Sequence, residues 1–494
     1  MSVLDQLVRM KGVFGREAAG RTVALLERLD RMRVRGPEEL IRLHETVLFL
    51  RAYPQSARVV RLADSILAGF AARLRDLDPA PFEDGEVSGI AGTGISTNFS
   101  YPFARRLVER HGREIEIDWE NYTHPDRLGS VLARLAPAAA EDWNVEAHVD
   151  WQQWFRALDG NLPWLLDRVD PATYDLLEIP LVWKLGDSFA TRSRSRLRRR
   201  KIFYHSGALI SRRDVSLEKE LAGPDIPSRR LAPAAAHSIL NLIVDASAVR
   251  YRELWGFLYP DVRRVEHANL GKGVELVWFG VAREQRLPLR AYHCGMFFKN
   301  GVPLGYIETL SFFERCEIGF NLYYTFREGE TAWLYARLLK FCNQKLGVTC
   351  FSIDPYQLGH ENDEAIDSGA FWFYRKLGFR PTAGPIAAAV DREEKKIAAK
   401  PGYRTPPATL RRIAEKPLFY GDSARWDSFS MRALCQRIGR GEAWPWIIAR
   451  VGGEVSVQEI VRAKLGPDEA RFLRLLQRAP QLRRSLLRFG RVRG

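Results

Sequence analysis

The chain has 494 residues, 46% of them hydrophobic, which is enough for two to four domains with apolar cores and excludes an intrinsically disordered chain. A net charge of +15 and a pI near 9.7 favour anionic partners or an arginine-rich solvated surface. Five cysteines without a CxxC pair argue against a disulfide framework, and no apolar run has the length of a signal peptide or a transmembrane helix. We therefore expect a soluble cytoplasmic protein.

The first 80 residues have the pattern of a helical region. Apolar residues recur at intervals of three and four in residues 22–29, 40–50 and 59–67, with Pro37 and Pro54 at natural breaks. We predict three or four packed helices, an arrangement that most often serves as a scaffold or an interaction surface.

A mixed α/β region is expected at residues 81–231. It begins with a glycine cluster at residues 88–97, followed by a helix at 102–111 and a strand at 114–118. This order imitates half of a dinucleotide-binding fingerprint, but the spacing Gly-x-x-Gly-x-Gly and the poor preceding strand favour an ordinary loop. Residues 126–169 are predicted to be helical.

The densest positive charge lies in this region, where seven of the eleven residues from Thr191 to Lys201 are basic. A run such as Arg192 to Lys201 can contact several phosphates of a nucleic acid or another polyanion. No recognisable nucleic-acid-binding module surrounds it. The alternative is a surface segment paired with the acids between Asp214 and Glu220.

Residues 232–390 have the most regular order of elements. A helix at 235–257 and a strand at 274–282 precede three strand-like runs at 289–299, 303–314 and 316–326. Asn300 and Gly301 join the first two runs, and this pair favours a type I′ hairpin because both residues must adopt positive φ. The first two strands are therefore expected to be antiparallel neighbours.

A helix at 332–345 and a fourth strand at 348–354 follow the three strands. After a polar loop, a short helix is expected to begin at Ser368, which can cap its start. It should end at Gly378, which stands where a left-handed residue terminates a helix. The predicted fold class is α/β, an α+β arrangement with a mixed sheet flanked by helices.

This order of elements resembles the GNAT superfamily of acyl-CoA-dependent N-acyltransferases. A typical pattern of that family is Asn-x-x-Ala-x-x-x-Tyr-x-Lys-x-Gly-Phe. The matching residues here are Ala370, Tyr374, Lys376, Gly378 and Phe379, with Asp367 in place of the asparagine. The resemblance implies a GNAT-like sheet whose third and fourth strands diverge at a cleft for acetyl-CoA or another acyl-CoA.

The resemblance also implies a loop for the pyrophosphate of the cofactor. The family prefers Arg/Gln-x-x-Gly-x-Gly/Ala, and residues 327–332 (Arg-Glu-Gly-Glu-Thr-Ala) keep the first and last positions, with Glu330 in place of the first glycine. Such a loop aims backbone N–H groups at phosphate oxygens. The cofactor-binding residues implied are Phe326, Arg327, Gly329, Thr331, Ala332, Asp367 and Ala370.

Attack of an amine on a thioester needs a base for the amine and a proton for the departing thiolate. The resemblance implies that Tyr374 is the acid, the alternative being an aromatic core residue. For the base it favours Glu317 over Glu308 and His293, the alternative being a solvent-facing strand carboxylate. The nine histidines are scattered without metal-ligand spacing, so no metal is expected.

Residues 391–494 are interpreted as a linker and a basic helical tail with helices at 426–438 and 467–487. The function predicted is transfer of an acyl group from acyl-CoA to an unidentified amine. The alternative is a non-catalytic protein of the same fold that binds nucleic acid or another polyanion through its arginine-rich segments. A third interpretation is a scaffold with neither activity.

Overall fold

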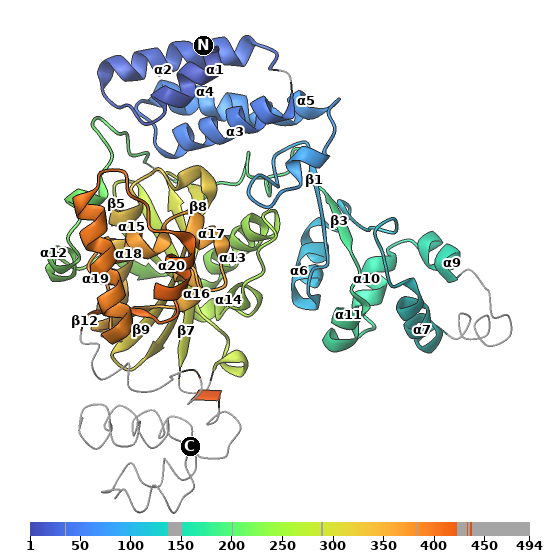
Figure 1. Ribbon diagram of the computed structural model, residues 1–494. Coiled ribbons are helices and arrows are strands. Elements are labelled where there is room, and N and C mark those ends of the chain that lie inside the picture. Colours follow the sequence, from blue (N-terminus) through green and yellow to red (C-terminus); the bar gives the residue numbers. More distant parts are fainter. Residues whose placement is uncertain are drawn as a thin grey trace, which may run out of the picture.

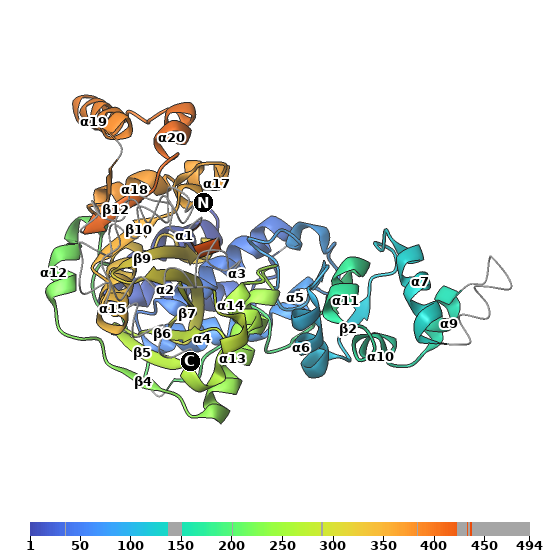
Figure 2. The same cartoon turned by 90° about the horizontal axis from the view of Figure 1, so that it is seen from below.

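The computed structural model describes residues 1–34, 36–136, 151–199, 201–287, 290–382 and 384–421, together with Arg432, Cys435 and Gln436. The described chain forms an N-terminal helical bundle, a small α/β unit that extends to one side, and a larger α/β unit (Figures 1 and 2). The helices predicted at 426–438 and 467–487 lie almost entirely outside these residues. None of the described helices has the length and apolar content needed to cross a bilayer.

The N-terminal region is helical, as predicted, and it has five helices where three or four were predicted. Its helices are α1 (Val3–Met10), α2 (Arg16–Arg31), α3 (Pro37–Ala52), α4 (Ala57–Ala68) and α5 (Phe70–Leu74). Their apolar faces meet around fully buried residues such as Leu26, Leu43 and Phe70. At the end of α3, the side-chain amide of Asn300 donates to the carbonyl oxygen of Ala52 at 2.9 Å, so the bundle is fixed to the larger unit.

The small unit is a three-stranded antiparallel sheet with helices packed on it. Its strands have the order β1-β3-β2. The elements are β1 (Gly94–Thr97), α6 (Tyr101–His111), β2 (Ile115–Ile117), α7 (Pro125–Leu135), α9 (Trp151–Ala157), α10 (Asn161–Leu166), α11 (Pro171–Leu177) and β3 (Leu181–Lys184). α6 and β2 confirm the predicted helix and strand.

The glycine cluster before β1 is a packed structural loop. Gly89 and Gly92 have φ values of 81° and 95°, and a Cβ on them would lie 2.5 Å from the carbonyl oxygen of Val249 and 2.8 Å from the Cα of Ala71. Only glycine allows such close main-chain contact at positive φ. The ordinary-loop interpretation accounts for these glycines.

The larger unit is built on a nine-stranded mixed sheet with the order β11-β12-β10-β9-β8-β7-β6-β5-β4. Only β9 and β10 are parallel neighbours among its described strands. The strands are β4 (Ser228–Arg230), β5 (Glu266–Gly271), β6 (Val274–Gly280), β7 (Ala291–Lys299), β8 (Val302–Phe312), β9 (Arg315–Leu322), β10 (Cys350–Ile353), β11 (Arg380–Pro381) and β12 (Leu418–Gly421).

The predicted hairpin and the predicted strand order in this sheet are confirmed. Asn300 and Gly301 have φ values of 49° and 83°, as a type I′ turn requires, and they join antiparallel β7 and β8. β9 pairs next with β8, then α15 (Thr331–Leu346) crosses over to β10. The parallel pairing of β9 with β10 needs such a crossover helix.

Helices cover both faces of the sheet (Figure 2). α15 and the bundle pack on one face, against residues such as Ile307, Ile318 and Phe320. α13 (Pro233–Ala248) and α14 (Trp255–Leu258) pack on the other face, against residues such as Cys294 and Met296. The helix predicted at 235–257 is therefore two helices, separated by a segment that contains Arg250.

The chain after β10 differs from the prediction in two places. Ser368 does not cap the last helix: its hydroxyl donates to the carbonyl oxygen of Ala365, and Gly369, in a left-handed conformation, precedes α18 (Ala370–Lys376). Residues 391–399 belong to a helix, α19 (Gly384–Ala399), which α20 (Pro407–Ile413) follows. β12 then enters the sheet between β10 and β11, so the sheet continues past the predicted boundary at residue 390.

Candidate functional site

β9 and β10 part after three paired residues. Cys350, Phe351 and Ser352 pair with the first three residues of β9. β9 continues to Leu322, whereas the chain after β10 turns into the short helices α16 (Pro355–Leu358) and α17 (Asp363–Asp367). Among the described residues, the main chain of β9 beyond Glu317 therefore has no strand partner on the β10 side.

A cavity of about 160 Å³ lies at the end where the two strands have parted. We call it the cleft. Its wall combines the end of β9 with the loop before β1, the segment after α13 and the residues after β10. The lining residues are Gly85, Glu86, Arg250, Arg252, Tyr306, Asn321, Leu322, Tyr323, Arg327, Tyr356, Asn362 and Glu364.

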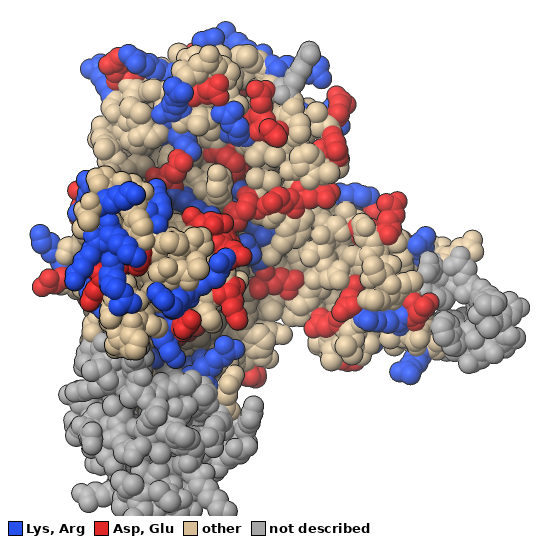
Figure 3. Space-filling view, in the orientation of Figure 1, with Lys and Arg blue, Asp and Glu red and all other residues tan. Residues whose placement is uncertain are grey.

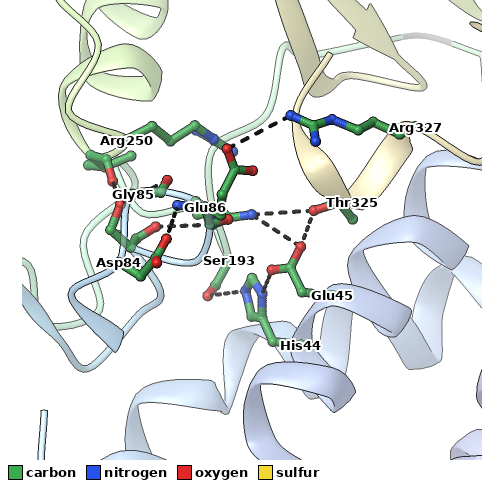
Figure 4. A network of polar contacts seen from close by, with 12 residues as sticks. His44, Glu45, Asp84, Gly85, Glu86, Ser193, Arg250, Thr325 and Arg327 are labelled. Carbon is green, nitrogen blue, oxygen red and sulfur yellow. Dashed lines mark hydrogen bonds and ion pairs between the residues drawn. The ribbon is translucent and has the colours of Figure 1, made fainter. Parts of the chain in front are cut away.

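A buried polar network lies beside the cleft (Figure 4). Arg192 is only 1% exposed, and its Nη2 lies 3.1 Å from Oε2 of Glu45 and 3.3 Å from Oγ1 of Thr325. Its Nη1 donates to the carbonyl oxygen of Glu86 at 2.6 Å. The hydroxyl of Thr325 also donates to Glu45. The network thus joins α3, the loop before β1, the arginine-rich segment and the turn η5 (Tyr324–Phe326).

His44 completes this network. Its Nδ1 lies 3.0 Å from Oε1 of Glu45, and its Nε2 lies 2.9 Å from Oγ of Ser193. Burial lowers the pKa of His44, so the neutral ring donates through Nδ1 and accepts from the Ser193 hydroxyl. Ser193 is 2% exposed and accepts a hydrogen bond from the backbone N–H of Ala91, which leaves no access for a substrate. Ser193, His44 and Glu45 therefore have a structural role.

The charge of Glu45 is held by its neighbours. Burial alone would raise the pKa of Glu45, but Arg192, His44 and Thr325 outweigh this effect and lower it to about 2. Glu45 and Arg192 therefore form a buried ion pair whose remaining polar atoms are largely satisfied.

Arg250 is buried to a similar extent without such a partner. It is 3% exposed, its Nη1 donates to the carbonyl oxygen of Ala246 at 2.6 Å, and its guanidinium carbon lies 4.1 Å from the centre of the Tyr323 ring. No described carboxylate lies within ion-pair distance of it, although Glu45 and Glu86 attract it from farther away, and its Nε has no hydrogen-bond partner among the described residues. Burial lowers the pKa of Arg250 to about 10.

Tyr374 lies near the point where the strands part. It is 4% exposed, and its hydroxyl lies 3.4 Å from Oε1 of Gln357 on α16. A Cβ on Gly319 of β9 would lie 2.9 Å from Nε2 of the same Gln357. The side chain of Gln357 thus lies between the hydroxyl of Tyr374 and Gly319 of β9. Burial raises the pKa of Tyr374.

The candidate bases differ in their distance from the cleft. Tyr306 and Asn321 line the cleft as a cross-strand pair; Glu308 belongs to the next pair on the same face, and Glu317 to the pair after that. At about 3.4 Å per residue, Glu308 is about 7 Å from the cleft and Glu317 about 14 Å. Burial raises the pKa of both carboxyls.

His293 lines a different cavity, of about 1440 Å³, at the other end of the sheet. It stacks on Trp278 with ring centres 4.2 Å apart, and burial and nearby arginines lower its pKa to about 4. The basic residues that line this cavity are Arg230, Arg263, Arg264, Arg283, Arg286, Arg290 and Lys345. We call it the basic cavity.

Glu330 has a structural role in the loop of residues 327–332, which we compared with a pyrophosphate-binding loop. This side chain is 3% exposed and accepts from Nζ of Lys299 at 3.1 Å and from the backbone N–H of Ile210 at 3.3 Å. A Cβ on Gly329 would lie 2.5 Å from the hydroxyl of Tyr53, so α3 covers this part of the loop. Burial lowers the pKa of Lys299 to about 8, against the attraction of Glu330.

The other implied cofactor residues are spread over this neighbourhood. Arg327 lines the cleft and forms an ion pair of 2.5 Å with Glu364. Phe326 and Ala332 are buried in the core, and the hydroxyl of Thr331 donates to the carbonyl oxygen of Arg327. Asp367 is exposed at the end of α17, and Ala370 begins α18. Of these residues, the structure brings only Arg327 to the cleft.

The arginine-rich segment is used largely inside the molecule. Arg192 belongs to the buried network, Arg194 pairs with Asp187, and Arg199 pairs with Glu275 at 3.4 Å. Arg196 donates to main-chain carbonyl oxygens, and burial lowers its pKa to about 9. Arg198 and Lys201 are the exposed basic residues in the described part of this segment. Neither a continuous basic face nor pairing with Asp214 to Glu220 is observed in the described residues.

Comparisons with family models, with curated proteins and with solved structures find no match. In the part of the chain that the structure describes, no cluster of side chains has the composition of a metal site. Sequence reasoning missed Glu45, Glu86, Arg250 and Thr325. A local signal exists only for Arg250, which with Arg252 follows shortly after a long apolar helix.

Proposed function

We propose that the larger α/β unit is an acyl-CoA-dependent N-acyltransferase with a GNAT-like arrangement. The observation that carries the proposal is the parallel pair β9 and β10, which parts after three residues and has a cleft at its open end. Unpaired main-chain groups of β9 can accept an extended ligand as a strand edge does. The pantetheine arm of an acyl-CoA is such a ligand, because it carries amide groups along its length.

The residues around the gap supply groups for acyl transfer. In the proposed reaction the amine nitrogen attacks the thioester carbonyl carbon, a carboxylate takes the proton of the amine, and the C–S bond breaks. Tyr374 then gives its proton to the departing thiolate. Glu308 is favoured as the base over Glu317 because it is one cross-strand pair from the cleft and its pKa is raised by burial.

The experiment is isothermal titration of acetyl-CoA and longer acyl-CoAs into the full chain. Gly319→Val is the informative variant, because a side chain there meets Gln357 and fills the gap between the strands. Gly207→Val is the matched control, since Gly207 is exposed and nothing lies near its Cβ position. We expect wild type and Gly207→Val to bind acyl-CoA and Gly319→Val to lose binding.

Absence of acyl-CoA binding by the wild type would overturn the proposal. The buried Glu330 and the Tyr53 hydroxyl over Gly329 would then explain why the loop does not accept a pyrophosphate. Equal binding by Gly319→Val would place the cofactor elsewhere and would remove the β9–β10 gap from the reaction.

A second candidate function, binding of a polyanion, is favoured by the basic cavity. Seven basic side chains and two acidic ones, Asp261 and Glu266, line it. A phosphate-rich ligand gains affinity from each neutralised phosphate. Binding of short single-stranded DNA at low salt, reduced by Arg263→Gln together with Arg264→Gln, would support this function. The basic cavity is separate from the arginine-rich segment, most of whose side chains have partners inside the molecule.

A further inference from the structure

The cleft contains a buried cationic group that no described carboxylate contacts. Arg250 has a guanidinium that is 3% exposed, packed on the ring of Tyr323 and held at one end by the carbonyl oxygen of Ala246. Its Nε donates to no described residue. A buried charge without a carboxylate in direct contact is unfavourable for folding, so such a residue in a cavity is most simply explained by a ligand.

The charges around the cleft indicate the charge of that ligand. Three arginines line it, Arg250, Arg252 and Arg327, together with two carboxylates, Glu86 and Glu364. Glu364 pairs with Arg327 at 2.5 Å, and Glu86 lies 3.9 Å from Arg252 and 3.8 Å from Arg327. Three positive charges less two negative ones leave one positive charge, so the cleft is matched to a monoanion.

The shape of the guanidinium and the size of the cavity narrow the chemistry. A guanidinium edge matches the two oxygens of a carboxylate through a pair of parallel hydrogen bonds. Figure 4 shows Arg250 and Arg327 approaching the same space from opposite sides, with Glu86 between them. About 160 Å³ accommodates a small molecule and no large group. The amide of Asn321 and the hydroxyl of Tyr306 in the wall are further hydrogen-bonding groups.

The surface around the cleft is suited to the ammonium group of a ligand that also carries a carboxylate. Figure 3 shows acidic side chains in a band between the bundle and the larger unit, while basic side chains gather over α19. Asp84, which is exposed, adjoins the cleft-lining residue Gly85 in sequence. Asp363, which adjoins Glu364, is exposed and pairs with Arg411 at 2.7 Å. An ammonium group is attracted to such a rim while a carboxylate reaches the buried arginine.

We propose that Arg250 binds the carboxylate of the acceptor, and that the acceptor is a free amino acid. This inference rests on the proposed acyltransferase function and specifies its substrate class. Arg250 is then a binding residue, Arg252 and Arg327 set the charge of the wall, and the amino group of the acceptor remains free for the reaction.

The experiment measures thermal stability of the full chain with each of the common amino acids, each paired with its C-terminal carboxamide, without acyl-CoA. At least one amino acid should raise the melting temperature of the wild type, and its carboxamide should not. Arg250→Met should abolish this response. Arg250→Lys should weaken the affinity by about tenfold or more, because lysine keeps the positive charge and lacks the two parallel N–H donors of the guanidinium. Arg198→Gln, which removes an exposed arginine elsewhere, should keep the response.

A second readout separates a binding role from a structural one. Because Arg250 is an unpaired buried charge, Arg250→Met without ligand should have a melting temperature equal to or above that of the wild type. A marked loss of stability would make Arg250 a structural residue and would overturn the proposal. Equal stabilisation by acids and carboxamides, stabilisation by inorganic phosphate alone, or no response to any amino acid would also overturn it.

The outcome is distinguishable from that of the acyl-CoA titration. If an amino acid binds through Arg250 and no acyl-CoA binds, the carboxylate site stands and the acyltransferase function fails. If acyl-CoA binds and no amino acid does, the function stands and the acceptor is of another class.

Discussion

The buried network around Arg192 and the cleft around Arg250 lie side by side. Each contains a buried arginine, but the two arginines have different contacts. Arg192 has Glu45, Thr325 and main-chain carbonyl oxygens as partners. Arg250 has one carbonyl oxygen, an aromatic ring and the cavity. A buried arginine that is ion-paired with a carboxylate holds segments together, whereas one that faces a cavity without an ion-paired carboxylate is available to a ligand. The partners of a buried arginine, and not its burial or residue type, therefore indicate whether it has a structural role or binds a ligand.

The largest expected effect comes from breaking the Arg192 network. Arg192→Met leaves Glu45 buried without its counter-ion, and loss of one partner of a buried ion pair costs about 3–5 kcal/mol of unfolding free energy. Urea denaturation at neutral pH measures the change. A loss below about 1 kcal/mol would contradict the comparison, because Arg192 would then be as dispensable as a surface residue.

Acid should remove the same stabilisation. The pKa of Glu45 is about 2 in the folded state and 4.5 in the ordinary state, so its contribution is complete above about pH 4.5 and is lost as the pH falls towards 2. A shift of this size corresponds to about 3 kcal/mol. The stability difference between the wild type and Glu45→Gln should therefore shrink by about this amount between pH 6 and pH 2. A difference independent of pH would show that Glu45 is not held charged by Arg192.

A change on the cleft side should affect turnover and leave stability almost unchanged. Tyr374→Phe preserves the buried ring and removes the hydroxyl that contacts Gln357 at 3.4 Å. If Tyr374 protonates the thiolate, kcat should fall by about a hundredfold with little change in acyl-CoA affinity. Steady-state kinetics with a free amino acid acceptor, together with the melting temperature, measures both. Parallel losses of stability and activity would make Tyr374 a core residue.

The smallest effect is expected at the exposed end of the arginine-rich segment. Arg198 is exposed, so Arg198→Gln should change the unfolding free energy by no more than about 0.5 kcal/mol. Urea denaturation of this variant and of Arg192→Met, which changes a residue six positions earlier, compares an exposed and a buried arginine of the same segment. A large loss in Arg198→Gln would mean that the whole run, and not only its buried members, has a structural role.

The sequence predicts the local order of the larger unit well. Alternating apolar runs, the Asn300–Gly301 turn and the helical spacing after Thr331 each depend on neighbouring residues, and the structure confirms β7, β8, β9, α15 and β10. Local signals were insufficient for β12, a strand of four residues whose partners come from distant parts of the chain. They were also insufficient for Ser368, where Gly369 in a left-handed conformation begins the helix instead.

The candidate site was less predictable for the same reason. Glu45 meets Arg192 across 147 positions and Thr325 across 280, and no local pattern reports such pairs. The charge run of residues 192–201 was visible, but its count of arginines does not reveal which of them are buried. Glu330 was recognised as a departure from a phosphate-binding loop, and its partner Lys299, on a strand 31 positions away, became visible only in the fold.

The late entry of β12 has a consequence for synthesis of the chain. β10 has β9 on one side and β12 on the other, and β12 is the last described strand to leave the ribosome. Until residue 421 has emerged, one edge of β10 has unpaired main-chain groups that can associate with other nascent chains. A chain that stops at residue 390 would keep that edge permanently, so its recovery from expression should be poor even though the cleft and its arginines are encoded in full.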